Sequence, residues 1–173
     1  MKNSLRILCL VALVCLAQIG LSQITTYRYA TASSGDGTTF FALAGTNGQL
    51  FFMNDYGDAA GVWKRYGLAM RPSGRNNLQF EILSAKNGTI FYALESNSGQ
   101  LHYMLDFGDK PGIWKPYGGV IRMVGSETLQ FKVDQVDNGA KFTAVDGNTG
   151  QVYYMFDHGD SDGAWKAYGQ IIK

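Results

Sequence analysis

Apolar and polar residues alternate along several short segments of the chain, and this alternation predicts β-strands. Segment 78–82 reads Leu-Gln-Phe-Glu-Ile, which places apolar side chains on one face of an extended strand and polar side chains on the other. Segments 90–94 and 101–106 follow it, and the turn between them is Ser96-Asn97-Ser98-Gly99. Asn and Gly accept the positive φ angles that tight hairpins need. A fourth strand is predicted to begin at Ile113 and to run on through Ile121.

This run of four strands occurs three times, at a fixed period of 51 residues, in units 23–71, 72–122 and 123–173. A period of this size is typical of repeat architectures, in which one supersecondary unit is copied and stacked. No unit contains a helical apolar period, so the predicted fold is all-β. The positions identical in all three copies are, in first-copy numbers, Gly37, Phe40, Ala42, Gly48, Gln49, Met53, Asp55, Gly57, Asp58, Gly61, Trp63, Lys64, Tyr66 and Gly67.

The faces of the predicted strands favour one architecture over another. The first strand of the second and third units has one polar face, whereas the second strand, as in 90–94, is apolar on both. A sheet covered on both sides lies between neighbouring sheets, as a propeller blade does. We therefore expect three tandem four-stranded antiparallel repeats that resemble propeller blades. A β-trefoil or another pseudo-threefold β fold is the alternative, because three units close a trefoil naturally and closed propellers have about 4–8 blades.

Three blades on their own would leave uncovered edges and an uncovered sheet face at each end, which is a liability for a secreted protein. Two chains could close a six-bladed ring by symmetric association. The propeller-like interpretation therefore predicts a homodimer, and the trefoil interpretation predicts a monomer.

The N-terminus has the pattern of a secretory signal peptide over residues 1–22. Lys2 and Arg6 precede an apolar run, and small residues at Gly20 and Ser22 stand before a cut ahead of Gln23. The run is too short for a membrane-spanning helix. Both cysteines lie within this leader, so the secreted chain 23–173 is expected to be a single domain held by its core without disulfides.

Composition excludes some partners. The chain has 15 Lys and Arg against 14 Asp and Glu, a formal net charge of +1, and no basic run. Binding to nucleic acid rests on clustered Lys and Arg, so nucleic acid is not an expected partner. Aromatic residues make up 13% of the chain, and aromatic rings serve both as core and as stacking surfaces for sugars.

Four repeated side-chain types are candidates for binding a ligand. An indole face could stack on a sugar ring or could fill the gap between sheets. The repeated Asp could bind a ligand, could ligate calcium in its Gly-rich loop, or could stabilise a turn. The repeated Lys and Gln could hydrogen-bond sugar hydroxyls, and the Lys could equally be a solvated charge at a sheet edge. The candidates are Trp63, Trp114, Trp165, Lys64, Lys115, Lys166, Asp55, Asp106, Asp157, Gln49, Gln100 and Gln151.

Catalysis has little support in the sequence. The part of the chain after the leader has no Cys, and its two His, His102 and His158, occupy different positions of the repeat. Neither belongs to a local motif of hydrolases or zinc enzymes. Three similar copies favour repeated binding over one asymmetric active site, and we expect neither an enzyme nor a cofactor or resident metal.

The order strand, Asn-x-Gly turn, strand with paired aromatics, short Gly loop, Gly-x-Trp and aromatic-Gly resembles a blade of the secreted β-propeller lectins, including the fucose-binding type. The resemblance implies sugar binding between adjacent blades and chains of few blades that oligomerise. The fucose-binding type uses a repeated Arg, whereas the repeated cation here is Lys64 and its copies, and Arg65 is replaced by Pro116 and Ala167.

We therefore expect a secreted, non-enzymatic, lectin-like module that binds carbohydrate at equivalent sites in three repeats. The main alternative is an extracellular structural or protein-interaction domain in which the same residues only stabilise the fold. An inhibitor or toxin on a trefoil scaffold is a third hypothesis.

Overall fold

The computed structural model describes residues 26–34, 36–56, 61–70, 78–85, 88–106, 112–121, 129–137, 139–157 and 163–171. Within these residues the chain forms strands and turns and no helix, which confirms the all-β prediction. The predicted leader lies outside the described residues, as do Gly57 and Asp58.

The strands fall into three sets that repeat along the chain. The first sheet contains β1 (Tyr27–Ser34), β2 (Gly37–Ala44), β3 (Leu50–Asn54) and β4 (Lys64–Tyr66). The second contains β5 (Leu78–Ala85), β6 (Gly88–Glu95), β7 (Leu101–Asp106) and β8 (Lys115–Tyr117). The third contains β9 (Leu129–Val136), β10 (Gly139–Asp146), β11 (Val152–Asp157) and β12 (Lys166–Tyr168).

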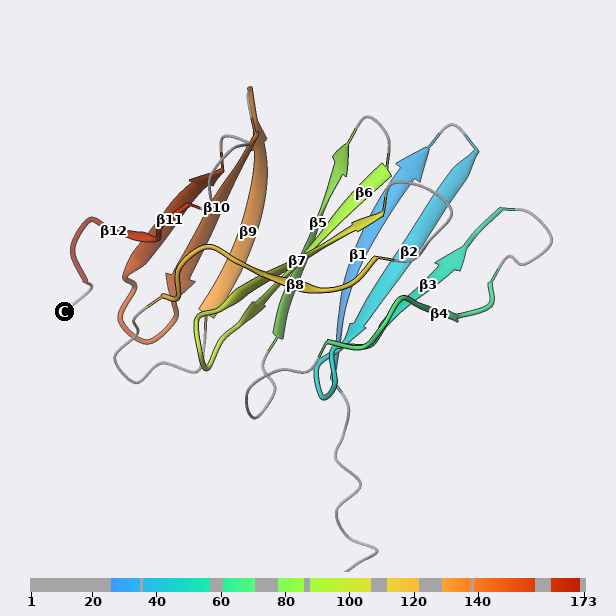
Figure 1. The fold of residues 1–173 in the computed structure, drawn as a ribbon, viewed down its shortest axis with the longest axis horizontal. Coiled ribbons are helices and arrows are strands. Elements are labelled where there is room, and N and C mark those ends of the chain that lie inside the picture. The colour runs from blue at the N-terminus through green and yellow to red at the C-terminus, as the bar shows by residue number, and fades with distance from the viewer. Residues whose placement is uncertain are drawn as a thin grey trace, which may run out of the picture.

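Each sheet is an antiparallel meander whose spatial order is the order of the chain, and the three sheets stand side by side (Figure 1). The registers repeat with the sequence: Tyr29 pairs with Ala42 as Phe80 pairs with Ala93. Among the described residues no strand pairs with a strand of another sheet. A β-trefoil would share strands in one barrel, so three separate blade-like sheets in tandem are the architecture, as the covered central strands predicted.

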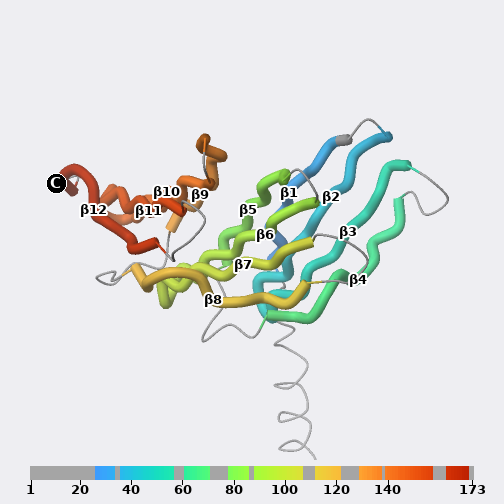
Figure 2. The backbone as a smooth tube through the Cα atoms, turned by 45° about the horizontal axis from the view of Figure 1, so that its top comes forward, coloured from blue at the N-terminus to red at the C-terminus, as the bar shows by residue number. Residues whose placement is uncertain are grey.

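The sheets approach one another through their first strands, since β1 lies beside β5 and β5 beside β9. Figure 2 shows the strand order of each sheet from a second direction, with β4 and β8 on the outer side. The contacts between neighbouring sheets are therefore concentrated at their first strands, a feature that they share with the blades of a propeller.

Side chains alternate between two faces of each sheet. We call the face that carries Tyr29, Phe51 and their repeat equivalents the front face, and the face that carries Leu43, Leu50 and their equivalents the back face. The back face of each sheet meets the front face of the next one.

The first interface, between the first and second sheets, is a buried cluster centred on Phe91, which is 0% exposed. Phe41 and Tyr66 of the first sheet contact Phe91 with ring centroids 4.9 and 5.7 Å away. The described residues contain no cysteine, so burial of aromatic area of this kind is the main stabilising contribution available to them.

The second interface repeats the first. Phe142 is also 0% exposed, and its ring centroid lies 5.0 Å from that of Tyr92 and 5.8 Å from that of Tyr117. Phe91 and Phe142 occupy the same position of the repeat, so equivalent residues lie at the centre of both cores.

The first strand of the third sheet keeps the polar face that alternation predicted. On β9 the pattern is regular, with Leu129, Phe131 and Val133 buried and Gln130 and Lys132 exposed. The predicted fourth strand is wrong in length, because β8 ends at Tyr117 and does not run on to Ile121. Gly118 follows it with φ 63°, a left-handed conformation that ends the extended run.

Candidate functional site

A cavity of about 450 Å³ opens between the first and second sheets at the end away from the Gly48 and Gly99 turns. Its volume is within the range of roughly 300–1,000 Å³ that is typical of ligand pockets. The back face of the first sheet and the ends of β5, β6 and β7 form its walls. The residues that line it are Ala32, Ser33, Thr39, Phe41, Phe52, Asn54, Tyr56, Tyr66, Ser84, Ala85, Gly88, Thr89 and Asp106.

One wall of this inter-sheet cavity holds a carboxylate beside a phenol. The hydroxyl of Tyr66 on β4 donates a hydrogen bond to Asp106 at the end of β7. Burial, and then this bond and the charge of Asp106, raise the pKa of Tyr66 well above its usual value of 10.0, so the phenol keeps its proton. The ring of Tyr66 is held in turn by an edge contact with Phe52, at a centroid distance of 5.8 Å.

The opposite part of the cavity holds neutral polar groups from one sheet. The hydroxyl of Thr39 donates to the amide oxygen of Asn54 at 3.2 Å and lies 3.3 Å from the hydroxyl of Tyr56. Hydroxyl, amide and carboxylate groups next to aromatic rings give a site that can hydrogen-bond a polyol and also cover its C–H face.

The corresponding region between the second and third sheets has a similar carboxylate and a different lining. The charge of Asp157 helps to raise the pKa of Tyr92, after burial as the larger cause. The positions equivalent to Thr39 and Asn54 are Ile90 and Leu105. The two inter-sheet regions therefore share the repeated Asp and differ in the polar groups around it.

The repeated Asp has a third setting in the first sheet. Asp55 is exposed, and its Oδ1 accepts a hydrogen bond from the backbone N–H of Thr38 at 2.6 Å. Asp106 and Asp157 each approach the sheet that precedes their own, and no preceding sheet exists among the described residues for Asp55.

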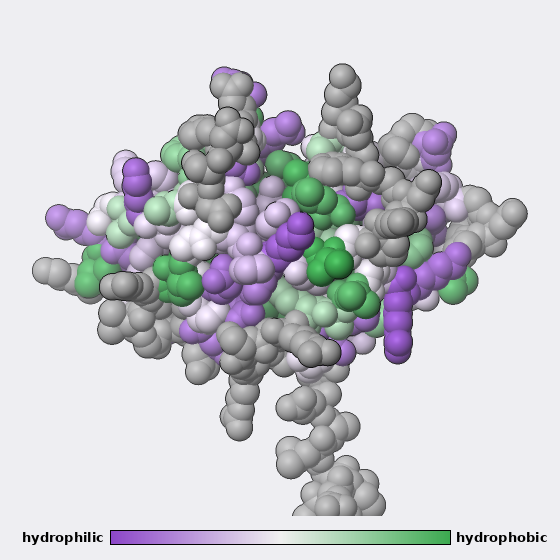
Figure 3. Space-filling model, viewed as in Figure 1, coloured by the Kyte–Doolittle hydropathy of each residue, from purple (hydrophilic) through white to green (hydrophobic). Residues whose placement is uncertain are grey.

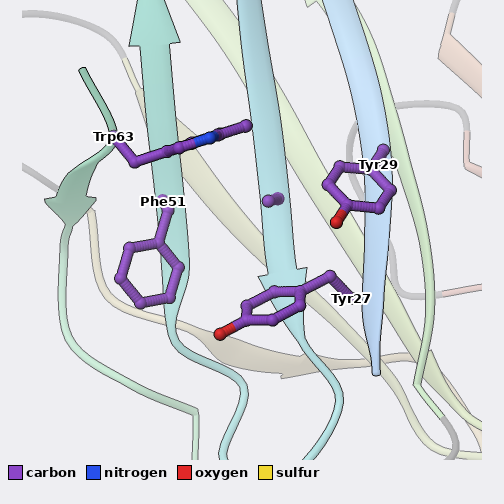
Figure 4. A pocket seen from close by; sticks show the side chains of 5 residues that line it. Tyr27, Tyr29, Phe51 and Trp63 are labelled. Carbon is purple, nitrogen blue, oxygen red and sulfur yellow. The ribbon is translucent and has the colours of Figure 1, made fainter. Parts of the chain in front are cut away.

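The repeated Trp lies elsewhere, on the front faces. Trp63 is 42% exposed and lines an open hollow of about 300 Å³ with Tyr27, Tyr29 and Phe51 (Figure 4). The ring centroids of Tyr27 and Phe51 are 6.2 Å apart. This aromatic group covers the front face of the first sheet.

Trp114 and Trp165 are partly buried against the two cores. Their indole Nε1 atoms are buried and have no hydrogen-bond partner in the described part of the chain. Trp114 also borders a cavity of about 590 Å³ with His102, Pro116 and the segment Leu68–Met70. The three Trp are therefore equivalent in sequence and unequal in exposure.

His102 is held within its own sheet. Its Nε2 lies 2.9 Å from Oε1 of the buried Glu95, whose other oxygen accepts a 2.7 Å hydrogen bond from the hydroxyl of Ser98. Burial lowers the pKa of His102 below its usual 6.5, against the opposing effect of Glu95. The imidazole is therefore neutral at pH 7 and donates its Nε2 proton to the carboxylate.

The repeated Gln makes the same contacts in every sheet, and the repeated Lys is exposed in every sheet. Nε2 of Gln100 donates to the carbonyls of Leu101 at 2.8 Å and Tyr117 at 3.3 Å, which joins the start of the third strand to the end of the fourth. Gln49 and Gln151 make the same two bonds in their own sheets. The side chains of Lys64, Lys115 and Lys166 are exposed on the outer strands.

The structure thus brings only one predicted residue, Asp106, into the inter-sheet cavity. Sequence reasoning missed the cavity residues Thr39, Asn54 and Tyr56, because they are not repeated in the other copies. The sequence did contain a signal for these residues, because each differs from the residues at the equivalent positions of the other two copies. The same holds for Tyr27 and Tyr29, which stand where later copies have Leu and Phe.

Among the described residues, no three His, Cys, Asp or Glu side chains gather in a group that could hold a metal ion, and residues 158–162 of the repeated Asp loop lie outside them. The described residues contain no helix with the length and apolar character needed to cross a membrane.

Fold and site together define an all-β protein of three blade-like sheets with a polar, aromatic-walled cavity between the first two. Comparison of the chain with protein-family models, with curated proteins and with solved structures finds no match.

Proposed function

We propose that the protein is a secreted, non-enzymatic carbohydrate-binding module and that the sugar binds in the inter-sheet cavity. The observation that carries the proposal is the side-chain set around Tyr66 and Asp106, a carboxylate, a phenol, an amide and hydroxyls beside the rings of Phe41 and Phe52. A pyranose offers the complementary surface, with hydroxyls at its rim and C–H groups on its face. The pattern of residues 1–22 supports export.

The carboxylate gives this site most of its expected selectivity. An ionised carboxylate accepts two hydrogen bonds from adjacent sugar hydroxyls, and hydrogen bonds to charged groups contribute roughly 1.5–3 kcal/mol each. Sugars with vicinal hydroxyls in one orientation should therefore bind better than their epimers. Asp157 offers the same carboxylate in a more apolar setting, so a second, weaker site belongs to the same proposal.

A glycan array probed with chain 23–173, followed by titration calorimetry with the best sugar, tests the proposal. Asp106→Asn should weaken binding by about 10- to 100-fold, the equivalent of roughly 1.5–3 kcal/mol. Asp134→Asn is the matched control, since Asp134 pairs with Lys132 at 2.7 Å on the third sheet, away from the cavity.

The alternative function, an extracellular structural or protein-interaction domain, makes the opposite prediction. In that case no sugar on a broad array binds, and Asp106→Asn changes only stability. Binding that survives both Asp106→Asn and Tyr66→Phe would place the sugar outside the inter-sheet cavity and contradict the proposal.

A further inference from the structure

The front face of the first sheet has the residues of a core surface, and no other sheet among the described residues covers it. Four of its positions, Phe40, Ala42, Met53 and Trp63, are identical in all three repeats. In the second sheet the matching Phe91, Ala93 and Met104 are each 0% exposed, because the preceding sheet lies over them.

The third sheet shows the same burial under the second. Its Phe142 and Ala144 are 0% exposed and its Met155 is 1% exposed. In the first sheet, by contrast, Phe40 and Met53 are only half-buried and Trp63 is 42% exposed. The Phe and Met positions are therefore fully buried in two sheets and only partly buried in the first, whereas Ala42 is buried in the first sheet as well, at 3% exposed.

The back face of the third sheet is the complementary uncovered surface. Tyr168 is 68% exposed and Phe156 is 39% exposed. Tyr154 and Tyr168 form an edge contact at 6.2 Å and 81°, the same pair that Tyr103 and Tyr117 form at 5.5 Å and 79° on the back face of the second sheet. In the second sheet this pair of tyrosines packs on the third sheet. The third sheet carries the same pair, although no sheet follows it among the described residues. In the view of Figure 3, hydrophobic side chains come to the surface in separate patches between hydrophilic ones.

We infer that a second copy of this chain covers these faces, so that the front face of the first sheet in one copy packs on the back face of the third sheet in the other. Two copies supply six sheets, within the range of about 4–8 that closes a propeller, and a twofold axis makes the two contacts equivalent. This inference is independent of the proposed function.

The repeat also assigns contacts across this interface. Tyr66 contacts Phe91 at 5.7 Å and Tyr117 contacts Phe142 at 5.8 Å. One Tyr and one Phe of these two repeated positions remain without such a contact among the described residues, Tyr168 and Phe40. The proposed interface pairs Tyr168 of one copy with Phe40 of the other. Between the first and second sheets, Tyr66 also donates a hydrogen bond to Asp106. Tyr168 of one copy is accordingly placed to donate to Asp55 of the other.

The first strands explain how such faces remain soluble before association. On β1 the front-face residues are Tyr27 and Tyr29, where the later sheets have Leu78 and Phe80. On β9 the back face carries the ion pair of Lys132 and Asp134, 2.7 Å apart, where the first sheet has alanines. Tyrosine presents an apolar ring with a polar tip and is enriched at interfaces that are also exposed to water. In the proposed dimer β9 of one copy lies beside β1 of the other, as β5 lies beside β9 within the chain, so this ion pair faces the tyrosines of β1.

Light scattering after size exclusion, from about 1 to 100 μM chain 23–173, measures the mass. We expect twice the mass of one chain, and Trp63→Glu and Tyr168→Glu should each raise the dimer dissociation constant at least 100-fold. Lys115→Glu, on an exposed outer strand of the middle sheet, is the control and should leave the dimer intact. Circular dichroism of each variant establishes that it is folded.

A strict monomer at 100 μM overturns the inference, as do open filaments of indefinite length. Loss of the dimer with Trp63→Glu but not with Tyr168→Glu would indicate a front-to-front contact and also overturns it. A monomer whose front face instead binds sugar or another protein through Trp63 is a further contradicting outcome.

Cross-linking gives a second, position-specific readout, because the chain after the leader has no native cysteine. A short thiol cross-linker should join Asp55→Cys chains to Tyr168→Cys chains in a mixture and should join neither variant to itself. Asn97→Cys, in the exposed turn after β6, replaces Asp55→Cys in the control mixture and should give no product. Self-linking of either variant, or no product in the mixture, contradicts the head-to-tail arrangement.

Discussion

Identity of a side chain in all three repeats does not by itself indicate a ligand-binding role in this protein. Gln100 is identical in all three copies, and the structure shows its amide nitrogen bonded to two carbonyls of its own sheet. Asp106 and Asp157, by contrast, each act on a tyrosine of the preceding sheet, Asp106 on Tyr66 and Asp157 on Tyr92.

The Gln column yields a stability prediction. Gln100→Ala should lower the free energy of unfolding by about 1–3 kcal/mol, because two part-buried carbonyls lose their donor. Gln130→Ala, at an exposed position of β9, should change it by less than about 0.5 kcal/mol. Urea denaturation measures both, and equal effects would contradict the assigned role.

His102 yields a pH prediction. Its pKa is lowered in the folded protein, so below pH 6.5 the unfolded chain binds more protons than the folded chain. The contribution of His102 to stability is therefore present above pH 6.5 and is lost as the pH falls through the folded pKa. The free energy of unfolding should decrease from pH 7 to pH 5. His102→Gln keeps a donor for Glu95 and cannot titrate, so it should flatten this slope; an unchanged slope would count against the assignment.

At the scale of the strand and turn, the fourth strand of each sheet is short because a left-handed glycine ends it. Gly67, Gly118 and Gly169 have φ angles of 61°, 63° and 74°. Gly118 is also tightly enclosed, since a Cβ there would lie 2.7 Å from the carbonyl oxygen of Gly163 in the third sheet. The next residue, Gly119, donates a backbone hydrogen bond to that oxygen at 3.3 Å.

Gly118→Ala should therefore destabilise the protein by about 1–2 kcal/mol from the backbone conformation alone, and by more from the contact with Gly163. Gly119→Ala is the matched control, because nothing lies within 4 Å of its added Cβ. Thermal unfolding followed by circular dichroism compares the two, and similar losses would mean that the turn is not the limiting feature.

At the scale of the whole molecule, the stack of sheets has two interior interfaces and two uncovered end faces among the described residues. If a second copy covers the end faces, stability depends on protein concentration, since association stabilises the folded state by mass action.

The midpoint of thermal unfolding should then rise by a few degrees as the concentration of chain 23–173 rises from about 1 to 100 μM. Trp63→Glu should unfold at a midpoint that is independent of concentration. Differential scanning calorimetry makes the measurement, and a concentration-independent midpoint in the unmodified chain would contradict association.

Much of the fold was predictable because its determinants are local. Alternation along segment 78–82, the Gly-bearing turns and the fixed period are all readable from neighbouring residues, and the structure confirms the three four-stranded antiparallel sheets. The length of the fourth strand was predicted wrongly because Val120 and Ile121 are apolar, and only the φ angle of Gly118 shows that the strand has already ended.

The candidate site was less predictable because it joins residues of different repeats. Identity among copies directed attention to Trp63 and Gln49, whereas the cavity depends on Thr39, Asn54 and Tyr56, which have no identical copies. Residues that are identical in all repeats maintain the structure that every sheet shares. A site that occurs once depends on residues that differ between the sheets.

The sequence by itself determined the strands, their inward and outward faces and the number of sheets, since a period of two along a strand and a fixed period along the chain are short-range properties. Only the tertiary structure decided which of the equivalent residues in the three repeats are buried by a neighbouring sheet. Trp63 and Trp114 are the same residue in the same local sequence, and one is exposed while the other borders the core. Burial depends on the sheet that lies opposite, which is a long-range property of the stack that identical repeats cannot specify.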